Sequence, residues 1–155
     1  MSTPPPVTLR PLTEEEFAGW SRRAAESFAA GMGPSRGLDP AAALEVARQE
    51  TTKLLPDGQD TENQLIWTAC HQGEPVGSLW ISTQRANPFI YGIEVHEDQR
   101  GKGYGRSIML AGEDECRRRG HEYLDLNVYG DNGTAIGLYD SLGYVVTSQQ
   151  MRKTL

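Results

Sequence analysis

The chain is organised around the segment Ile93-Glu94-Val95-His96-Glu97-Asp98-Gln99-Arg100-Gly101-Lys102-Gly103-Tyr104-Gly105-Arg106. An apolar run at 89–95 predicts a β-strand, and the residues after it have a helical pattern that closes at Gly120. Three glycines within five residues let a ligand approach the backbone closely, and the first turn of a helix presents unpaired N–H groups. With the basic side chains of Arg100, Lys102 and Arg106, this strand-to-helix turn predicts an anion site suited to phosphate.

Two common nucleotide-binding motifs do not fit this segment. A Walker P-loop needs Gly-x-x-x-x-Gly-Lys-Ser/Thr, which the residues after Gly101 do not supply. A dinucleotide fingerprint needs Gly-x-Gly-x-x-Gly, but Arg106 stands three positions after Gly103. The spacing that does occur is Arg-x-x-Gly-x-Gly, formed by Arg100, Gly103 and Gly105.

A second motif follows in the segment 126–144. After a short apolar strand it contains Asn132-x-x-Ala135, then Leu138-Tyr139, then Gly143-Tyr144. The two motifs, in this order, resemble those of the GCN5-related N-acetyltransferases, the GNAT superfamily. The resemblance covers about residues 89 to 144, and the N-terminal half agrees only in general layout. It implies an α/β fold with a mixed sheet, mostly antiparallel with one splayed parallel strand pair, flanked by about four helices.

Composition limits the class of protein. With 155 residues the chain fits one domain, expected over 7–155 after a disordered lead-in at 1–6 that lacks the features of a secretory signal. The net charge of −6 argues against nucleic acid, and no apolar run approaches a membrane span. Cys70 and Cys116 lack metal-ligand spacing, so we expect two buried thiols and no metal site. We therefore expect a cytoplasmic protein.

The first half of the chain predicts an edge strand, two helices and a hairpin. Pro11 places the strand 7–12 at a sheet edge, and a capping box at Thr13 starts a helix that we expect to end near Gly31. A flexible loop over 31–37 and a second helix, from Asp39 to Leu54 or Leu55, are expected next. Strands at 64–70 and 75–81 form the hairpin.

The second half predicts a crossover to a parallel strand. The helix after the glycine-rich turn connects the strand 89–95 to a strand at 123–128, and such a helical crossover makes the two parallel. A short helix at 134–142 follows. The last run, 143–153, has no turn residues inside it, so we expect one long or bulged strand there.

The resemblance implies how a cofactor would bind. Strands ending at Val95 and Val128 would splay apart and expose backbone groups to the pantetheine arm of acetyl-CoA. The pyrophosphate would bind the glycine-rich turn, and Asn132 and Tyr139 would face the thioester arm. The cofactor-binding residues implied in this way are Ile93, Val95, Arg100, Gly101, Lys102, Gly103, Tyr104, Gly105, Arg106, Asn132 and Tyr139.

Two side chains are candidates for the chemistry. An unpaired carboxylate within a strand covered on both faces would be costly, so the presence of Glu94 calls for an explanation. Glu94 is therefore the candidate base for the amine. Tyr139 resembles the general acid of the family, which protonates the departing thiolate. Glu94 could instead be exposed or paired with an arginine, Tyr139 could be a core residue, and Asn132 could cap a helix.

The acceptor amine is not defined by the sequence. In the family the acceptor site lies around the first two helices and the hairpin ends, here near Trp20, Phe28, Met32, Arg36, Trp80 and Gln84. An aminoglycoside, a polyamine, an amino acid and a peptide N-terminus all remain open. A non-catalytic acyl-CoA sensor of the same fold is the alternative to an enzyme, and a homodimer is common in the family.

Overall fold

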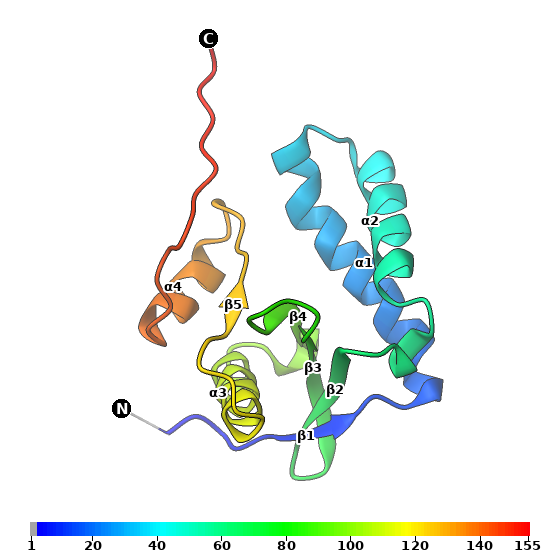
Figure 1. Ribbon diagram of the computed structural model, residues 1–155, viewed down its shortest axis with the longest axis vertical. Helices are drawn as coiled ribbons and strands as arrows, with labels where there is room; N and C mark the ends of the chain where they lie inside the picture. The colour runs from blue at the N-terminus through cyan, green and yellow to red at the C-terminus, as the bar shows by residue number, and fades with distance from the viewer. Residues whose placement is uncertain (1–2) are drawn as a thin grey trace.

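A five-stranded mixed sheet in the order β1-β2-β3-β4-β5 forms the centre of the fold, as Figure 1 shows. The computed structural model describes residues 3–155. The strands are β1 (Thr8–Pro11), β2 (Gln64–His71), β3 (Glu74–Ser82), β4 (Phe89–Val95) and β5 (Asp125–Leu126). Neighbours from β1 to β4 are antiparallel, whereas β4 and β5 are parallel. The expected α/β fold with one parallel pair is confirmed.

Four α-helices cover the two faces of this sheet. They are α1 (Glu14–Arg36), α2 (Pro40–Leu54), α3 (Tyr104–Arg118) and α4 (Gly133–Ser141), with 3-10 turns η1 (Gly58–Asp60) and η2 (Glu97–Gln99). On one face, Trp20 of α1 packs with Ile66 and Trp80. On the other, Ile108 of α3 packs with Leu79. The helix pair α1–α2 and the helix α3 therefore lie on opposite faces (Figure 1).

Local sequence signals fix the starts of the first two helices. Thr13 and Glu16 form a capping box, in which the Thr13 side chain accepts from the Glu16 N–H and the Glu16 carboxylate accepts from the Thr13 N–H. Asp39 caps α2, accepting from the Ala42 N–H at 2.8 Å, and Pro40 occupies the first helical position. Both predicted starts are confirmed.

The predicted end of α1 near Gly31 is wrong. The helix continues to Arg36 and closes at Gly37, whose φ of 69° is left-handed. Its glycines serve close packing, because a Cβ at Gly33 would lie 2.9 Å from Cβ of Ala43 in α2. Pro34 is tolerated in the final turn, and the residues expected to form a flexible loop belong to the helix.

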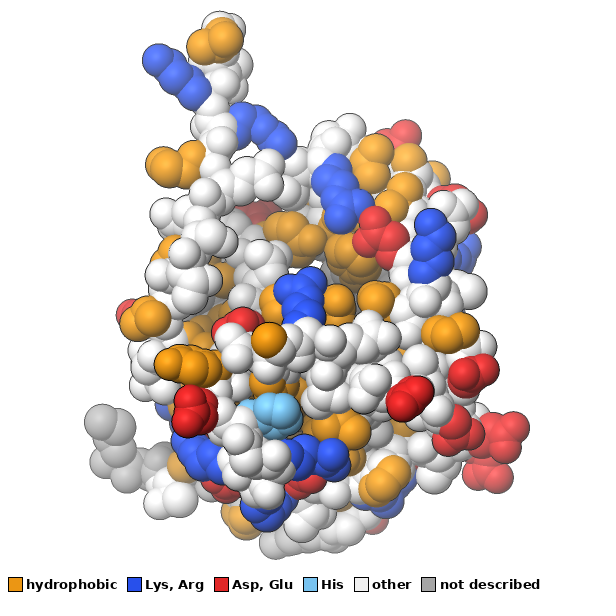
Figure 2. Space-filling model, viewed as in Figure 1, with side chains coloured by type: hydrophobic (Ala, Val, Ile, Leu, Met, Phe, Trp, Pro, Cys, Tyr) orange, Lys and Arg blue, Asp and Glu red, His pale blue; other side chains and the backbone are white. Residues whose placement is uncertain are grey.

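Two expectations for the C-terminal part also need correction. The fifth strand pairs over only Asp125–Leu126, and residues 143–153, expected as a strand, have no regular secondary structure. After Tyr144, which packs on the core, the chain continues as an extended tail (Figures 1 and 2), and Arg152 in this tail donates to the Ser35 carbonyl of α1 at 2.7 Å. Val145, Val146 and Met151 are 71–87% exposed. Strand propensity alone does not form a strand, because its hydrogen bonds need a partner strand.

The parallel pair splays because β4 bends after its first residues. Phe89 and Ile90 pair with Asp125 and Leu126, and no later residue of β4 pairs with β5 in residues 3–155. The β3–β4 register shifts so that Trp80 faces Gly92 while Ile81 faces Ile90, which leaves Tyr91 as the extra residue of a bulge. Backbone groups of Gly92–Val95 therefore face the gap toward β5 without a strand partner.

Part of the N-terminal lead-in lies on the body of the fold. Met1 and Ser2 are outside the described residues, but the Pro5 carbonyl accepts a hydrogen bond from Ser107 Oγ at 2.5 Å. The Pro6 carbonyl lies 2.7 Å from His71 Nδ1. Among the residues that the structure describes, no helix has both the length and the apolar character needed to cross a membrane.

Candidate active site

The glycine loop, residues 100–105, connects η2 to the start of α3. Gly101 and Gly103 have φ of 76° and 89°, in the left-handed region that other residues rarely adopt. Gly103 is also the N-cap residue of α3. Residues 100–103 are exposed, so the loop presents its backbone and the N-terminus of α3 to solvent. This is the backbone arrangement that binds phosphate groups.

The basic side chains around this loop have different partners. Arg100 Nε donates to the Val95 carbonyl at 3.2 Å, and Lys102 Nζ donates to Gln99 Oε1 at 3.2 Å. Both side chains stay near the loop. Arg106 instead donates to Ser141 Oγ of α4 at 2.6 Å. Arg106 therefore links α3 to α4, and a bound phosphate would have to compete with Ser141 for it.

The first residues of α3 hold the site together. Tyr104 is 7% exposed and its ring centroid lies 5.4 Å from that of His71, so only its backbone is available to a ligand. A Cβ at Gly105 would lie 3.5 Å from Leu138 of α4 and 3.9 Å from Val95 of β4. The helix start is thus within contact distance of both α4 and β4.

Glu94 points to the α1 face, where it is engaged on both oxygens. Its Oε2 accepts from Arg23 Nε of α1 at 2.6 Å, and its Oε1 accepts from Ser78 Oγ of β3 at 3.1 Å. His96 Nε2 lies 3.9 Å from the same Oε1. The pairing with an arginine, left open by the sequence, is therefore present, and its partner is Arg23.

A cavity of about 260 Å³ lies beside this carboxylate, between α1 and the β2–β3 part of the sheet. Arg23 and Ser78, the two side chains hydrogen-bonded to Glu94, both line it, as does His96. Trp20 and Thr68 supply further apolar and hydroxyl lining. The cavity thus has apolar surface from Trp20, Leu12 and Pro75 and a polar end at the Glu94 ion pair.

Glu16 is a second carboxylate in this cavity, and Arg10 balances its negative charge. It accepts two hydrogen bonds from Arg10, at 2.8 and 3.2 Å, and one from Thr68 Oγ1 at 3.1 Å. The hydrogen bonds from Arg10 are the main cause that lowers the pKa of Glu16 to about 2. Glu16 is therefore ionised at neutral pH, and its low pKa makes it a weak base for an ammonium proton.

Tyr139 and Asn132 come from α4 and its N-terminus. Tyr139 is half-buried with its ring centroid 6.0 Å from that of Tyr144, and burial raises the pKa of its phenol. The phenol is therefore protonated at neutral pH. Asn132 Oδ1 accepts from the Ala135 N–H at 3.2 Å, so Asn132 caps α4, as one of its two predicted alternatives stated.

The side chains expected around the acceptor do not form one site. Met32 is fully buried among alanines of α1 and α2, and Trp20 and Trp80 pack edge to face with centroids 5.4 Å apart. Gln84 is exposed, beyond the end of β3. Trp80 and Met32 serve the core, whereas Trp20 is buried and also lines the cavity beside Glu94.

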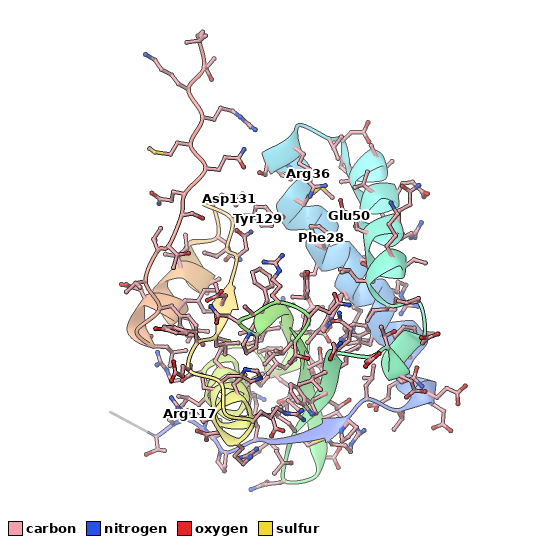
Figure 3. The ribbon with its side chains drawn as sticks, viewed as in Figure 1. Phe28, Arg36, Glu50, Arg117, Tyr129 and Asp131 are labelled. Carbon is pink, nitrogen blue, oxygen red and sulfur yellow. The ribbon has the colours of Figure 1, made fainter. Side chains whose placement is uncertain are left out.

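Phe28 and Arg36 lie elsewhere, at the C-terminal half of α1 (Figure 3). Arg36 pairs with Glu50 of α2 at 2.8 Å, and its guanidinium is 5.9 Å from the centre of the Phe28 ring. Tyr129, which follows β5, packs against the same part of α1 (Figure 3).

Sequence analysis missed Arg23, Ser78 and His96. Arg23 lies three residues after Trp20, on the side of α1 that faces the sheet, but an arginine on a helix is usually a solvated residue. Ser78 stands opposite Glu94 in the antiparallel register, a pairing that the sequence could have suggested. No signal in the sequence joins Arg23 to Glu94, because they are 71 residues apart.

Comparisons with known proteins agree with this geometry. The family model for the acetyltransferase (GNAT) family matches residues 37–144. The N-acetyltransferase YdgE of Bacillus subtilis is 33% identical over 153 residues, covering 96% of this chain and 98% of YdgE. The chain therefore belongs to the GNAT acetyltransferase family.

A solved structure and a relative with a named substrate add detail. The crystal structure of the acetyltransferase YycN of B. subtilis matches with a TM-score of 0.89 and 30% identity, covering 96% of this chain and 98% of YycN. The L-methionine sulfoximine/L-methionine sulfone acetyltransferase of Salmonella typhimurium is 33% identical over 107 residues, covering 58% of this chain and 63% of that protein.

Proposed function

We propose that the protein transfers an acetyl group from acetyl-CoA to the primary amine of a small molecule. The observation that carries this proposal is the glycine loop with left-handed Gly101 and Gly103, set beside the unpaired edge of β4. The loop would take the pyrophosphate, and the backbone of Ile93 and Val95 would bind the pantetheine arm like an added strand. Asn132 and Tyr139 would line the other side of this arm.

The chemistry needs one proton acceptor and one proton donor. The amine nitrogen attacks the thioester carbonyl carbon, the new C–N bond forms, and the C–S bond breaks. An alkylammonium has a pKa of about 10.4, so its proton must be removed before attack. Glu94 would accept that proton, directly or through water, and Tyr139 would protonate the departing thiolate. The raised pKa of Tyr139 supports this role, because the phenol carries its proton at neutral pH.

The class of acceptor has support from one relative. The Salmonella protein is named for two amino-acid derivatives, which are small molecules with an amine. A small acceptor also suits a cavity of about 260 Å³. The composition that favours a cytoplasmic protein is consistent with a soluble metabolite as acceptor.

Thermal unfolding tests the cofactor. Acetyl-CoA at about a hundred times its dissociation constant stabilises a protein by roughly 2.7 kcal/mol, which here should raise the midpoint by about 5–10 °C. The Gly103→Ala variant should lose this rise, because alanine disfavours the left-handed φ of position 103 and the loop would change its conformation. Gly120→Ala is the matched control, since Gly120 has φ of 84°, open space around it, and lies at the far end of α3.

Each result has a clear meaning. If acetyl-CoA does not shift the midpoint, or shifts both variants equally, the glycine loop does not bind it and the proposal falls. If acetyl-CoA binds but no amine releases free CoA, the chain is an acyl-CoA sensor rather than an enzyme. ATP and NAD serve as comparison ligands.

We also propose that the protein forms a homodimer through its C-terminal tail. Val145, Val146 and Met151 are exposed on an extended segment, and β5 is the last strand of the sheet. A strand added from a second copy would cover these apolar side chains and pair with the free edge of β5. Light scattering on the full chain should give twice the monomer mass, and deletion of residues 145–155 should give the monomer. A monomeric full chain would refute this.

A further inference from the structure

The ion pair between Arg23 and Glu94 has one side that is not used within the protein. Arg23 engages Glu94 through Nε alone, at 2.6 Å. Its terminal nitrogen NH1 lies over Gly19, where a Cβ would be 3.3 Å away. Within residues 3–155, neither NH1 nor NH2 of Arg23 makes a hydrogen bond. Both terminal nitrogens of a guanidinium that lines the cavity can thus donate to a ligand.

The other charges around the cavity do not use up these donors. Glu16 is held by Arg10 and Thr68, and Glu15 is exposed in the first turn of α1. His96 Nε2 lies 3.9 Å from Glu94 Oε1, and an imidazole has no negative charge that could pair with Arg23. Arg23 is therefore the cavity's cation, and its side chain is 41% exposed, so a solute can reach it.

The pair of charges selects among the four kinds of acceptor that the sequence left open. A cation and a carboxylate in contact are the electrostatic complement of a molecule whose ammonium and carboxylate are also adjacent. Polyamines and aminoglycosides carry several cations and no carboxylate, so they would leave the guanidinium without an anion. A peptide N-terminus has an amide where a free amino acid has a carboxylate, so it would leave the guanidinium without its anion.

We infer that the acceptor is a free α-amino acid, bound with its carboxylate on NH1 and NH2 of Arg23 and its ammonium at Glu94. A planar guanidinium binds a carboxylate through two parallel hydrogen bonds, which fixes the orientation of the amino acid. Trp20, Leu12 and Pro75 line the cavity with the apolar surface that its side chain would contact. The inference rests on the proposed acetyl transfer and names its substrate class and a specificity-determining residue.

A comparison of matched acceptors tests whether the protein recognises the α-carboxylate. Release of CoA from acetyl-CoA is measured with the twenty standard L-amino acids. The best of these is then compared with its α-amide and its decarboxylated amine, and with spermidine and kanamycin. The amino acid should exceed its amide and its decarboxylated amine at least tenfold in kcat/KM. Equal rates for the three, or a preference for spermidine or kanamycin, would overturn the inference.

Substitutions in α1 test whether Arg23 binds the carboxylate of the acceptor. Arg23→Gln should lower kcat/KM for the amino acid at least tenfold while the decarboxylated amine loses far less, and Arg23→Lys should restore part of the preference. Arg22→Gln is the control, because Arg22 is exposed on the same helix. If Arg23→Gln lowers activity on both acceptors equally, Arg23 only positions Glu94 and does not read the carboxylate.

The failure of this inference can be told from the failure of the proposed function. If acetyl-CoA raises the unfolding midpoint and an amine without a carboxylate is acetylated best, the acetyl transfer stands and the amino-acid assignment is wrong. If acetyl-CoA binds and no acceptor of the panel is acetylated, the amino-acid assignment is also wrong. If acetyl-CoA itself does not bind, the proposed function has failed first.

Discussion

The ring of Tyr129 lies against Gly31 so closely that a Cβ on this glycine would be 2.8 Å from ring atom Cδ2. Tyr129 follows β5 and Gly31 lies in the C-terminal half of α1, so the contact joins the segment after β5 to α1, and Figure 3 labels Tyr129 beside this helix. The ring also packs against the buried cluster of α1 and α2, which includes Met32. Gly31 therefore lacks a side chain at the point where the Tyr129 ring packs against α1.

Gly31→Ala should therefore destabilise the protein, although alanine is normally the better helix former by about 1 kcal/mol. The new methyl group would displace Tyr129. Gly137→Ala in α4 is the control, because a Cβ there meets nothing within 4 Å, and it should raise the unfolding midpoint. Adding Tyr129→Ala to Gly31→Ala should remove the conflict. A midpoint that rises in Gly31→Ala as much as in the control would contradict this packing.

Tyr139→Phe should lower kcat about a hundredfold while leaving the unfolding midpoint nearly unchanged, since general acids contribute roughly 10²–10⁴. Burial raises the pKa of the Tyr139 phenol, so the acid form persists through neutral pH. The alkaline limb of the wild-type pH–rate profile should then lie above about pH 10 and should be absent in Tyr139→Phe. The measurement is CoA release against pH, and an unchanged kcat would show that another group supplies the proton.

Glu16→Gln should lower the free energy of unfolding by about 1 kcal/mol at neutral pH. The effect is modest because Glu16 and Arg10 are partly exposed and solvent screens their attraction. The folded-state pKa of Glu16, about 2, is below its ordinary value of 4.5. The stabilisation is therefore complete above pH 4.5 and is lost as the pH falls from 4.5 toward 2. Unfolding midpoints of wild type and variant should converge over that range.

Glu14→Gln is the control for this experiment, because Glu14 is exposed in the same helical turn and makes no side-chain hydrogen bond among the described residues. Its free energy of unfolding should change by less than about 0.5 kcal/mol, as is usual for an exposed side chain. A gap between wild type and Glu16→Gln that stays constant down to pH 2 would mean that the Arg10 ion pair does not stabilise the fold.

The two cysteines should resist a thiol reagent in the native protein. Cys70 and Cys116 are buried and free, and burial raises the pKa of the Cys116 thiol, which disfavours the reactive thiolate. Reaction with dithiobisnitrobenzoate should be slow without denaturant and complete with it. Rapid reaction of one thiol in the native state would contradict the packing of α3 or β2. The same protection makes this reagent suitable for detecting CoA release.

Much of the fold follows from short-range signals in the sequence. The capping box of Thr13 and Glu16 involves residues only three positions apart, so the sequence predicted the start of α1. Pro11 lacks an N–H, and β1 is an edge strand as expected. The spacing of Arg100, Gly103 and Gly105 likewise predicted the strand-to-helix turn and the family, because both depend on residues a few positions apart.

The errors lie where the outcome depends on distant contacts. Gly33 and Pro34 predicted a loop, but Gly33 allows α1 to approach Ala43 of α2, and that packing extends the helix. The tail after Gly143 has the composition of a strand but no strand beside it in the described chain. Local propensity is weak compared with tertiary packing, so such segments cannot be predicted from their own residues.

The sequence by itself determined the class of the protein, the position of the glycine loop and the candidates Glu94 and Tyr139, because these depend on motifs within single segments. Only the tertiary structure decided what surrounds Glu94. Arg23 and Ser78 reach its carboxylate from α1 and β3, elements far from it in the chain. The physical reason is that a hydrogen bond or ion pair forms between atoms within about 3 Å, and only the packing of helix on sheet brings these atoms together.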